Sequence, residues 1–151
     1  MKYWIDAEFN SYGGQLISLG MVREDNESLY LVYNRPMHIH PWVKEHVMPY
    51  LDSVPDHISI HRIFPSNSAK YIEKFMASDD NPIVITDWPD DISFFSELLL
   101  TGPGTMINIP RISFRMHRID AYPTKVEGAV QHNAWWDAVA LKAKCEELGL
   151  E

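Results

Sequence analysis

The sequence lacks the features that mark secreted and membrane-bound proteins. Its single cysteine, Cys145, cannot form an internal disulfide. The opening residues MKYWIDAEFN contain two acids where a signal peptide needs an uninterrupted apolar region. No stretch approaches the roughly 20 apolar residues of a membrane-spanning helix. These absences predict a cytoplasmic protein that has no membrane partner.

Positive charge is also scarce in this chain. Its 13 Lys and Arg residues face 21 Asp and Glu residues, for a net charge of −8. This balance argues against a protein that binds nucleic acid through a broad basic surface. A polyanionic substrate would need local compensation, either from divalent cations or from the segment RISFRMHR at residues 111–118. A solvated face that balances nearby acids is an equally good interpretation of that segment.

Internal repeats, low-complexity tracts and linkers rich in Gly, Ser or Pro are absent as well. The chain has 151 residues, of which 46% are hydrophobic and 23% charged. This composition is typical of a folded domain with one core. We therefore expect residues 1–151 to form a single domain.

Hydrophobic periodicity predicts an alternation of strands and helices along the chain. The expected elements are three antiparallel strands within residues 2–34, helices over 40–51 and 66–78, a strand over 82–86, a helix over 90–100, a strand over 105–109 and a helix over 133–148. This order predicts an α/β fold with a mixed five-stranded sheet flanked by helices.

Two acids interrupt the first predicted strand, KYWIDAEF. Side chains two positions apart on a strand point to the same side, so Asp6 and Glu8 place their carboxylates next to each other. Such anions repel each other unless a cation lies between them, and Mg²⁺ and Mn²⁺ prefer carboxylate oxygens. A strand with one solvated face explains these two acids equally well, so D-x-E alone is a weak signal.

Further acids occur in TDWPDDISFF and HNAWWDA, where a sheet of this order brings helix starts to the same region. Asp90 and Asp91 also suit a helix N-terminus, where acids are common because they favour the helix dipole. Asp137, by contrast, lies about one turn into the last helix, past the capping position. His132 precedes that helix, so H-x₄-D places an imidazole and a carboxylate at one helix end.

This ordered set of D-x-E, a central Asp and H-x₄-D resembles the DEDDh 3′–5′ exonucleases, which have a ribonuclease-H-like fold and use two metal ions. The chain is more similar still to the ribonuclease AS type of exoribonuclease, because the D-x-E-F strand is followed by segments like LISLG and PWVKEHVMPYL. The resemblance covers most of the chain. It implies an exoribonuclease that releases nucleoside 5′-monophosphates.

The resemblance also implies a role for each motif residue. Asp6, Glu8 and Asp137 would hold two Mg²⁺ or Mn²⁺ ions, and His132 would be the general base.

The central acid has two candidates. Relatives carry bulky apolar residues three and four positions after this acid, as Asp91 does with Phe94 and Phe95. Asp91 is therefore the preferred metal ligand. Asp87 lies at the strand end, where relatives often carry Asn, and it remains a competing ligand.

Substrate contacts follow from the same resemblance. We expect Phe9, Asn10 and Asn133 to contact the terminal nucleotide, by stacking and hydrogen bonding. Trp135 or Trp136 offers a further stacking surface, although core packing is the alternative for each aromatic residue. RNA is the expected substrate, and a homodimer is the expected assembly, because relatives are exoribonucleases and often dimers.

Three alternatives remain at this point. The same chemistry can act on DNA, or the fold can be a catalytically silent module that binds nucleic acid. A different metal hydrolase is the third, because MHIHPWVKEHV supplies three histidines that could bind zinc: His38, His40 and His46. That segment has no clear carboxylate partner.

Overall fold

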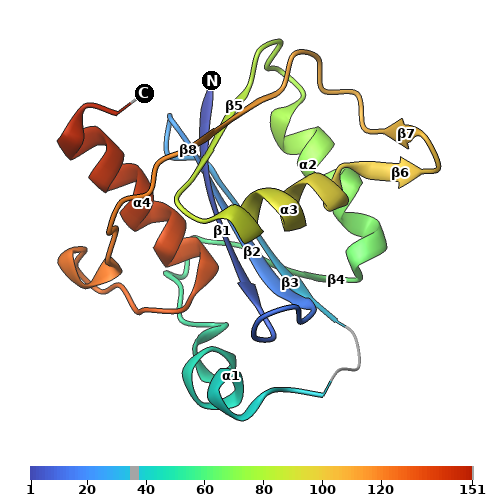
Figure 1. Cartoon of the computed structure of the whole chain (residues 1–151). Helices are drawn as coiled ribbons and strands as arrows, with labels where there is room; N and C mark the ends of the chain where they lie inside the picture. The colour runs from blue at the N-terminus through green and yellow to red at the C-terminus, as the bar shows by residue number, and fades with distance from the viewer. Residues whose placement is uncertain (35–37, 151) are drawn as a thin grey trace.

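A mixed six-stranded sheet forms the centre of the computed structural model, which describes residues 1–34 and 38–150 (Figure 1). The strands are β1 (Lys2–Phe9), β2 (Leu16–Arg23), β3 (Ser28–Tyr33), β4 (Ile60–Ile63), β5 (Ile83–Thr86) and β8 (Ser113–Met116), in the spatial order β4-β3-β2-β1-β5-β8. Strands β1, β2 and β3 are antiparallel, whereas β4, β5 and β8 each pair in parallel. The α/β class and the three leading antiparallel strands are therefore confirmed.

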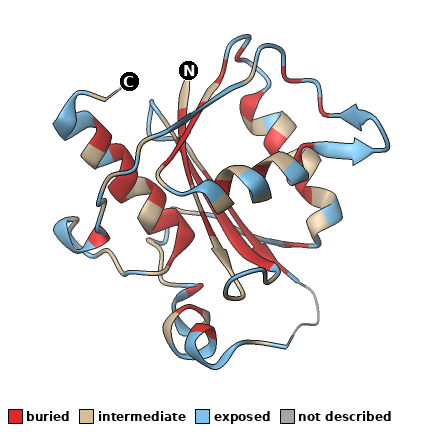
Figure 2. Ribbon diagram, viewed as in Figure 1, coloured by how far each residue is buried: buried red, intermediate tan, exposed pale blue. Residues whose placement is uncertain are grey.

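Helices cover both faces of this sheet. They are α1 (Pro41–His46), α2 (Ser68–Met76), α3 (Pro89–Leu98) and α4 (Ala134–Leu148). Alternate residues of β1 enter different cores: Tyr3 and Ile5 pack with residues of α2 and α3, whereas Trp4 packs with residues of α4. Figure 2 shows the resulting burial, with the central strands buried and the outer loops exposed. Among the described residues, no helix is both long and apolar enough to cross a membrane.

Two expectations about the sheet are wrong. The strand predicted at residues 105–109 does not join it: β7 (Thr105–Met106) pairs with β6 (Leu100–Gly102) in a separate hairpin. The sheet also has six strands rather than five, because it includes β4 and β8, neither of which was predicted. Strand β8 lies inside the basic segment, and all four of its residues are exposed. Its sequence SFRM does alternate polar and apolar side chains, as strands do, but this segment was interpreted only by its positive charge.

A glycine lets α4 lie directly on the sheet. A Cβ atom at Gly20, in the middle of β2, would lie 2.2 Å from the carbonyl oxygen of Ala134 and 2.5 Å from the backbone nitrogen of Trp135. The side-chain oxygen of Asn133 caps the helix by accepting hydrogen bonds from the backbone N–H groups of Trp135 and Trp136, both at 3.1 Å. These contacts bring the first turn of α4, and with it Asp137, beside β1.

The substitution Gly20→Ala is expected to destabilise the protein by about 2 kcal/mol, because the added methyl group meets helix backbone that cannot move aside. Urea unfolding measures the change. Gly102→Ala is the matched control, since its Cβ meets only the Thr105 side chain, at 3.2 Å. Equal midpoints for the two variants would show that α4 does not depend on this close approach.

Candidate metal centre

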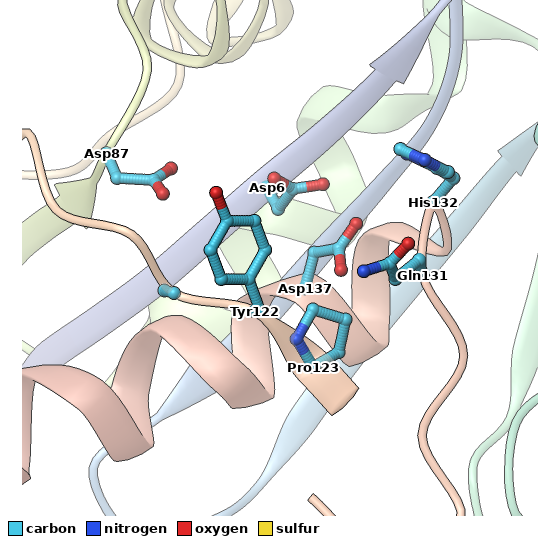
Figure 3. Close-up of a pocket in the computed structure, with 8 residues that line it drawn as sticks. Asp6, Asp87, Tyr122, Pro123, Gln131, His132 and Asp137 are labelled. Atoms are coloured by element: carbon cyan, nitrogen blue, oxygen red, sulfur yellow. The ribbon is translucent and has the colours of Figure 1, made fainter. Parts of the chain in front are cut away.

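A cavity of about 230 Å³ opens beside β1, the end of β5 and the first turn of α4 (Figure 3). Its lining residues are Asp6, Asp87, Ala121, Tyr122, Pro123, Gln131, His132 and Asp137. Figure 3 shows the carboxyl groups of Asp6 and Asp137 facing a common space, with Asp87 on the opposite side of it. The cavity therefore collects acids from three separate parts of the chain.

Strand register explains how one group of acids meets. Strands β1 and β5 are parallel, with Lys2 opposite Ile83 and Trp4 opposite Ile85. Continuing this register places Asp87 level with Asp6. Asp91 follows on the first turn of α3, and carboxylate oxygens of Asp6, Asp87 and Asp91 lie within 4.8 Å of one another.

Helix α4 completes a second group. Ligand atoms of Glu8, His132 and Asp137 also lie within 4.8 Å of one another. The carboxyl group of Glu8 and the backbone N–H of His132 both lie close enough to the Asp137 carboxyl group to act on its pKa, in opposition to its burial. The predicted D-x-E and H-x₄-D motifs therefore meet in space.

Burial raises the pKa of every carboxyl group in these two groups. The pKa values of Asp91 and Asp137 rise to about 7. Those of Asp6 and Glu8 rise well above their usual range through burial and then through neighbouring acids, and burial raises that of Asp87. No ion pair within residues 1–34 and 38–150 involves any of the five. Their negative charge must therefore be neutralised by protons or by bound cations.

The donor set fits a hard divalent cation. Carboxylate oxygens are the ligands that Mg²⁺ and Mn²⁺ prefer, and both groups are built on them. The Oδ2 atom of Asp6 is buried and has no hydrogen-bond partner among the described residues. A buried oxygen of this kind is costly unless a cation or proton compensates it.

Asp91 and Asp87 both lie beside Asp6, but in different settings. Asp91 is almost fully buried, where it accepts hydrogen bonds from the backbone N–H of Ala7 at 3.2 Å and from the hydroxyl of Thr86 at 2.6 Å. Asp87 is half-buried, and it lines the open cavity. Each carboxylate oxygen of Asp91 keeps a second lone pair. The two candidates for the central acid therefore both remain.

His132 lies at the mouth of the cavity in an unusual backbone conformation, with a φ of 59°. The ring of Trp42, on α1, meets the His132 imidazole edge to face, with centroids 5.0 Å apart. Burial, and then the nearby His46, lowers the pKa of His132. Its imidazole is therefore neutral at neutral pH and able to accept a proton.

Asn133 does not face the cavity, and the expectation that it contacts substrate is wrong. The residue is completely buried. Its side-chain oxygen caps α4, and its amide donates hydrogen bonds to the carbonyl of Tyr50 at 2.8 Å and to the hydroxyl of Tyr30 at 3.3 Å. All of its polar atoms are therefore used inside the protein.

Asn10 is also engaged within the protein. Its amide donates to the carbonyl of His38, and its side-chain oxygen accepts from the backbone N–H of His40 at 2.8 Å. These bonds tie the end of β1 to the segment that leads into α1 and Trp42. Asn10 therefore supports the wall of the site, and a direct contact with a nucleotide stays a prediction.

The expected aromatic contacts divide into two cases. Trp135 and Trp136 are 6% and 8% exposed and belong to the core, as the packing alternative holds. Phe9 is half-buried, with its ring centroid 5.1 Å from that of Phe94. A stacking role for Phe9 stays a prediction.

The three histidines of the zinc alternative do not form a cluster. His40 Nδ1 accepts from the backbone N–H of Trp42 at 3.3 Å, and His46 Nδ1 lies 2.9 Å from the carbonyl of Trp42. No group of potential metal ligands in the described part of the chain contains His38, His40 or His46. The geometry thus gives this alternative no support.

Several residues that line or support the cavity were not predicted from the sequence. Tyr122, Pro123 and Gln131 line the site from the segment between β8 and α4, which contains the short 3-10 helix Pro123–Lys125 but no other regular element. Thr86 holds Asp91, and Arg118 donates a hydrogen bond to the carbonyl of Asp87 at 2.8 Å. The segment that carries Tyr122 and Gln131 has no periodicity, and the concentration of arginines in RISFRMHR was the one sequence signal near it.

No family model matches this sequence, and no curated protein matches it.

Proposed function

We propose that this protein is a metal-dependent 3′–5′ exonuclease that acts on RNA and releases nucleoside 5′-monophosphates. One observation carries the proposal: Asp6, Asp87 and Asp137 line one open cavity together with a neutral histidine, and Asp91 and Glu8 each have a ligand atom within 4.8 Å of one of these acids. A cluster of buried acids lowers the stability of the fold. Cations held beside a phosphodiester would offset this loss and would give the acids a catalytic role.

Two Mg²⁺ or Mn²⁺ ions would be held by the two groups of acids, one by Asp6 with Asp87 or Asp91, the other by Glu8 and Asp137. When bound, such ions supply Lewis-acid activation of the phosphodiester and stabilise the charge of the leaving oxygen. They would also offset the negative charge of the cavity, so that a nucleic acid can approach an acidic protein.

The protein's own residues hold the proton acceptor in place. His132 accepts a proton from the attacking water, because its lowered pKa leaves the ring neutral. The ring of Trp42 packs edge to face against the imidazole, and ligand atoms of His132, Glu8 and Asp137 lie within 4.8 Å of one another. The base is thus held beside the acids.

The fold supports this proposal. Three antiparallel strands come first, parallel strands follow, and the acids appear in the order D-x-E, central Asp, H-x₄-D, as in ribonuclease-H-like DEDDh exonucleases. Action on RNA, a homodimeric assembly and a cytoplasmic location belong to the same proposal, by the resemblance to the ribonuclease AS type.

The test is stepwise shortening of 5′-labelled single strands of RNA and of DNA, with and without Mn²⁺. We expect a ladder from the 3′ end of RNA that needs the metal and is abolished by EDTA. If DNA is shortened faster than RNA, the protein is a DNA exonuclease rather than an exoribonuclease. Strands that are bound but never shortened would instead indicate the silent nucleic-acid-binding module.

The substitution His132→Ala is expected to lower turnover about a hundredfold, the usual scale for loss of a general base, with little change in metal affinity. Turnover of labelled RNA and calorimetric titration with Mn²⁺ measure the two effects. Asp137→Asn is the comparison, because that change removes a ligand and should weaken metal binding. Equal losses of metal affinity in the two variants would make His132 a ligand rather than a base.

Separate substitutions Asp87→Ala and Asp91→Ala decide which acid is the central ligand. The ligand variant should lose turnover by at least about a hundredfold and bind Mn²⁺ more weakly. Thr86→Val serves as a control for Asp91, because it removes the 2.6 Å hydrogen bond to Asp91 and keeps the carboxylate. If neither acid affects metal affinity, this group of acids does not hold an ion.

A further inference from the structure

An exposed tryptophan is held in a fixed orientation beside the cavity. Trp88 directly follows Asp87 and is 46% exposed. Its Nε1 atom donates to the carboxylate of Asp90 at 2.7 Å, and the guanidinium of Arg118 lies 4.7 Å from its ring centroid. A large ring that stays exposed although two contacts orient it is suited to bind a ligand.

The topology of the sheet places this tryptophan and arginine together. Strands β5 and β8 are parallel neighbours, so the residues that follow them emerge at the same edge. The backbone N–H of His117 donates to the carbonyl of Thr86 at 2.9 Å, and Arg118 donates to the carbonyl of Asp87 at 2.8 Å. Trp88 and Arg118, called here the Trp88–Arg118 platform, therefore adjoin the wall of the cavity that contains Asp87.

Positive charge lies along the edge strand that leads to this platform, in a chain with a net charge of −8. Arg115 on β8 and Arg118 just after it are exposed, and Arg111 is exposed before the other end of the strand. None of the ion pairs found within the described ranges uses these arginines. Their guanidinium groups thus keep donors that can bind phosphate oxygens.

We propose that the Trp88–Arg118 platform and Arg115 bind single-stranded nucleic acid outside the cavity, with a base stacked on Trp88 and phosphates at the arginines. This inference rests on the proposed function and names its substrate class. Only an unpaired strand can present a base face to an indole, because the bases of a duplex are stacked on each other. The platform therefore binds nucleotides upstream of the one in the cavity.

The platform makes affinity depend on strand length. Because Trp88 does not line the cavity, we expect a dinucleotide to occupy the cavity without reaching the platform, whereas a longer strand reaches both. One stacked base contributes about tenfold in affinity. A purely structural role for Trp88, as a clamp for the start of α3, would instead affect short and long substrates equally.

The experiment compares kcat/KM on a dinucleotide and on a single-stranded RNA of about ten nucleotides. We expect Trp88→Ala to lower kcat/KM for the longer strand about tenfold more than for the dinucleotide, chiefly through KM. Trp88→Phe should restore most of the loss because it keeps an aromatic face. Phe64→Ala is the matched control, since Phe64 is 58% exposed and follows β4 at the opposite edge of the sheet.

Direct binding separates failure of the platform from failure of the proposed function. Anisotropy of labelled single-stranded RNA, measured in the His132→Ala background, should show Kd about tenfold higher when Trp88 is also replaced by Ala. Arg115→Gln should weaken binding and flatten its salt dependence, with Lys74→Gln as the control. The platform is overturned if Trp88→Ala lowers kcat/KM equally on both substrates, or if it leaves the Kd for single-stranded RNA unchanged. A wild type that binds through Trp88 but hydrolyses neither substrate overturns the exonuclease and leaves the platform standing.

Discussion

Replacing Asp6 with asparagine is expected to lower exonuclease turnover roughly a thousandfold, because metal ions supply several kcal/mol of transition-state stabilisation. The same change should make the metal-free protein harder to unfold at neutral pH. Burial and then Asp91 raise the pKa of Asp6, so its charge opposes folding when no cation is present. Asparagine keeps the shape of the side chain and removes the charge.

A substitution that lowers activity but raises the stability of the metal-free protein is characteristic of a metal ligand, because the buried charge of such a residue destabilises the fold until a cation binds. Turnover of labelled RNA with Mn²⁺ and urea unfolding in EDTA measure the two. Asp56→Asn, at an exposed loop position, is the control and should change neither. An Asp6→Asn protein that unfolds more easily in EDTA than the wild type would show that the carboxylate has a structural partner.

The metal-free protein is expected to lose stability as the pH rises from about 5 to about 8.5, by on the order of 3–5 kcal/mol. The pKa values of Asp91 and Asp137 are about 7 in the folded protein against an ordinary 3.8. The folded state therefore binds more protons than the unfolded state in this range. The stabilisation that these bound protons give to the folded state is lost as the pH passes through 7. His132, with a lowered pKa, acts in the opposite direction below pH 6.5 and offsets part of the change.

Saturating Mn²⁺ should flatten or reverse this decline, because cations bind the deprotonated carboxylates that become available as the pH rises. Chemical unfolding at each pH, with EDTA and with Mn²⁺, provides the comparison. Asp137→Asn should have a shallower decline in EDTA. A metal-free stability that rises across this range, or a decline that Mn²⁺ does not change, contradicts the electrostatic account.

Strong periodicity made most of the fold predictable from sequence. Strand β1 alternates between two cores, and α4 begins at a side-chain cap, so both carry clear local signals. Strand β8, which is exposed at a sheet edge beside β5, was missed although its residues alternate between polar and apolar, because its segment was interpreted only by its positive charge. The apolar run at 105–109 was misleading: Ile107 and Ile109 are buried, but as irregular chain against the core rather than as a strand of the sheet.

The candidate site divides along a similar line. Asp6, Glu8, His132 and Asp137 were predictable because each occupies a definite place on a strand or at a helix start, and the structure brings them together. Asn133 misled because a residue just before a helix can serve either as a cap or as a contact to a ligand, and only burial distinguishes the two roles. Tyr122 and Gln131 depend on an irregular segment that no local pattern predicts.

The central claim is that the acids of this cavity share divalent cations. Anomalous diffraction from crystals soaked in Mn²⁺ tests it most directly. We expect two peaks, one among Asp6, Asp87 and Asp91 and one beside Glu8 and Asp137. A map without Mn²⁺ in the cavity, with these carboxyl groups bonded to one another as protonated pairs, would contradict the account.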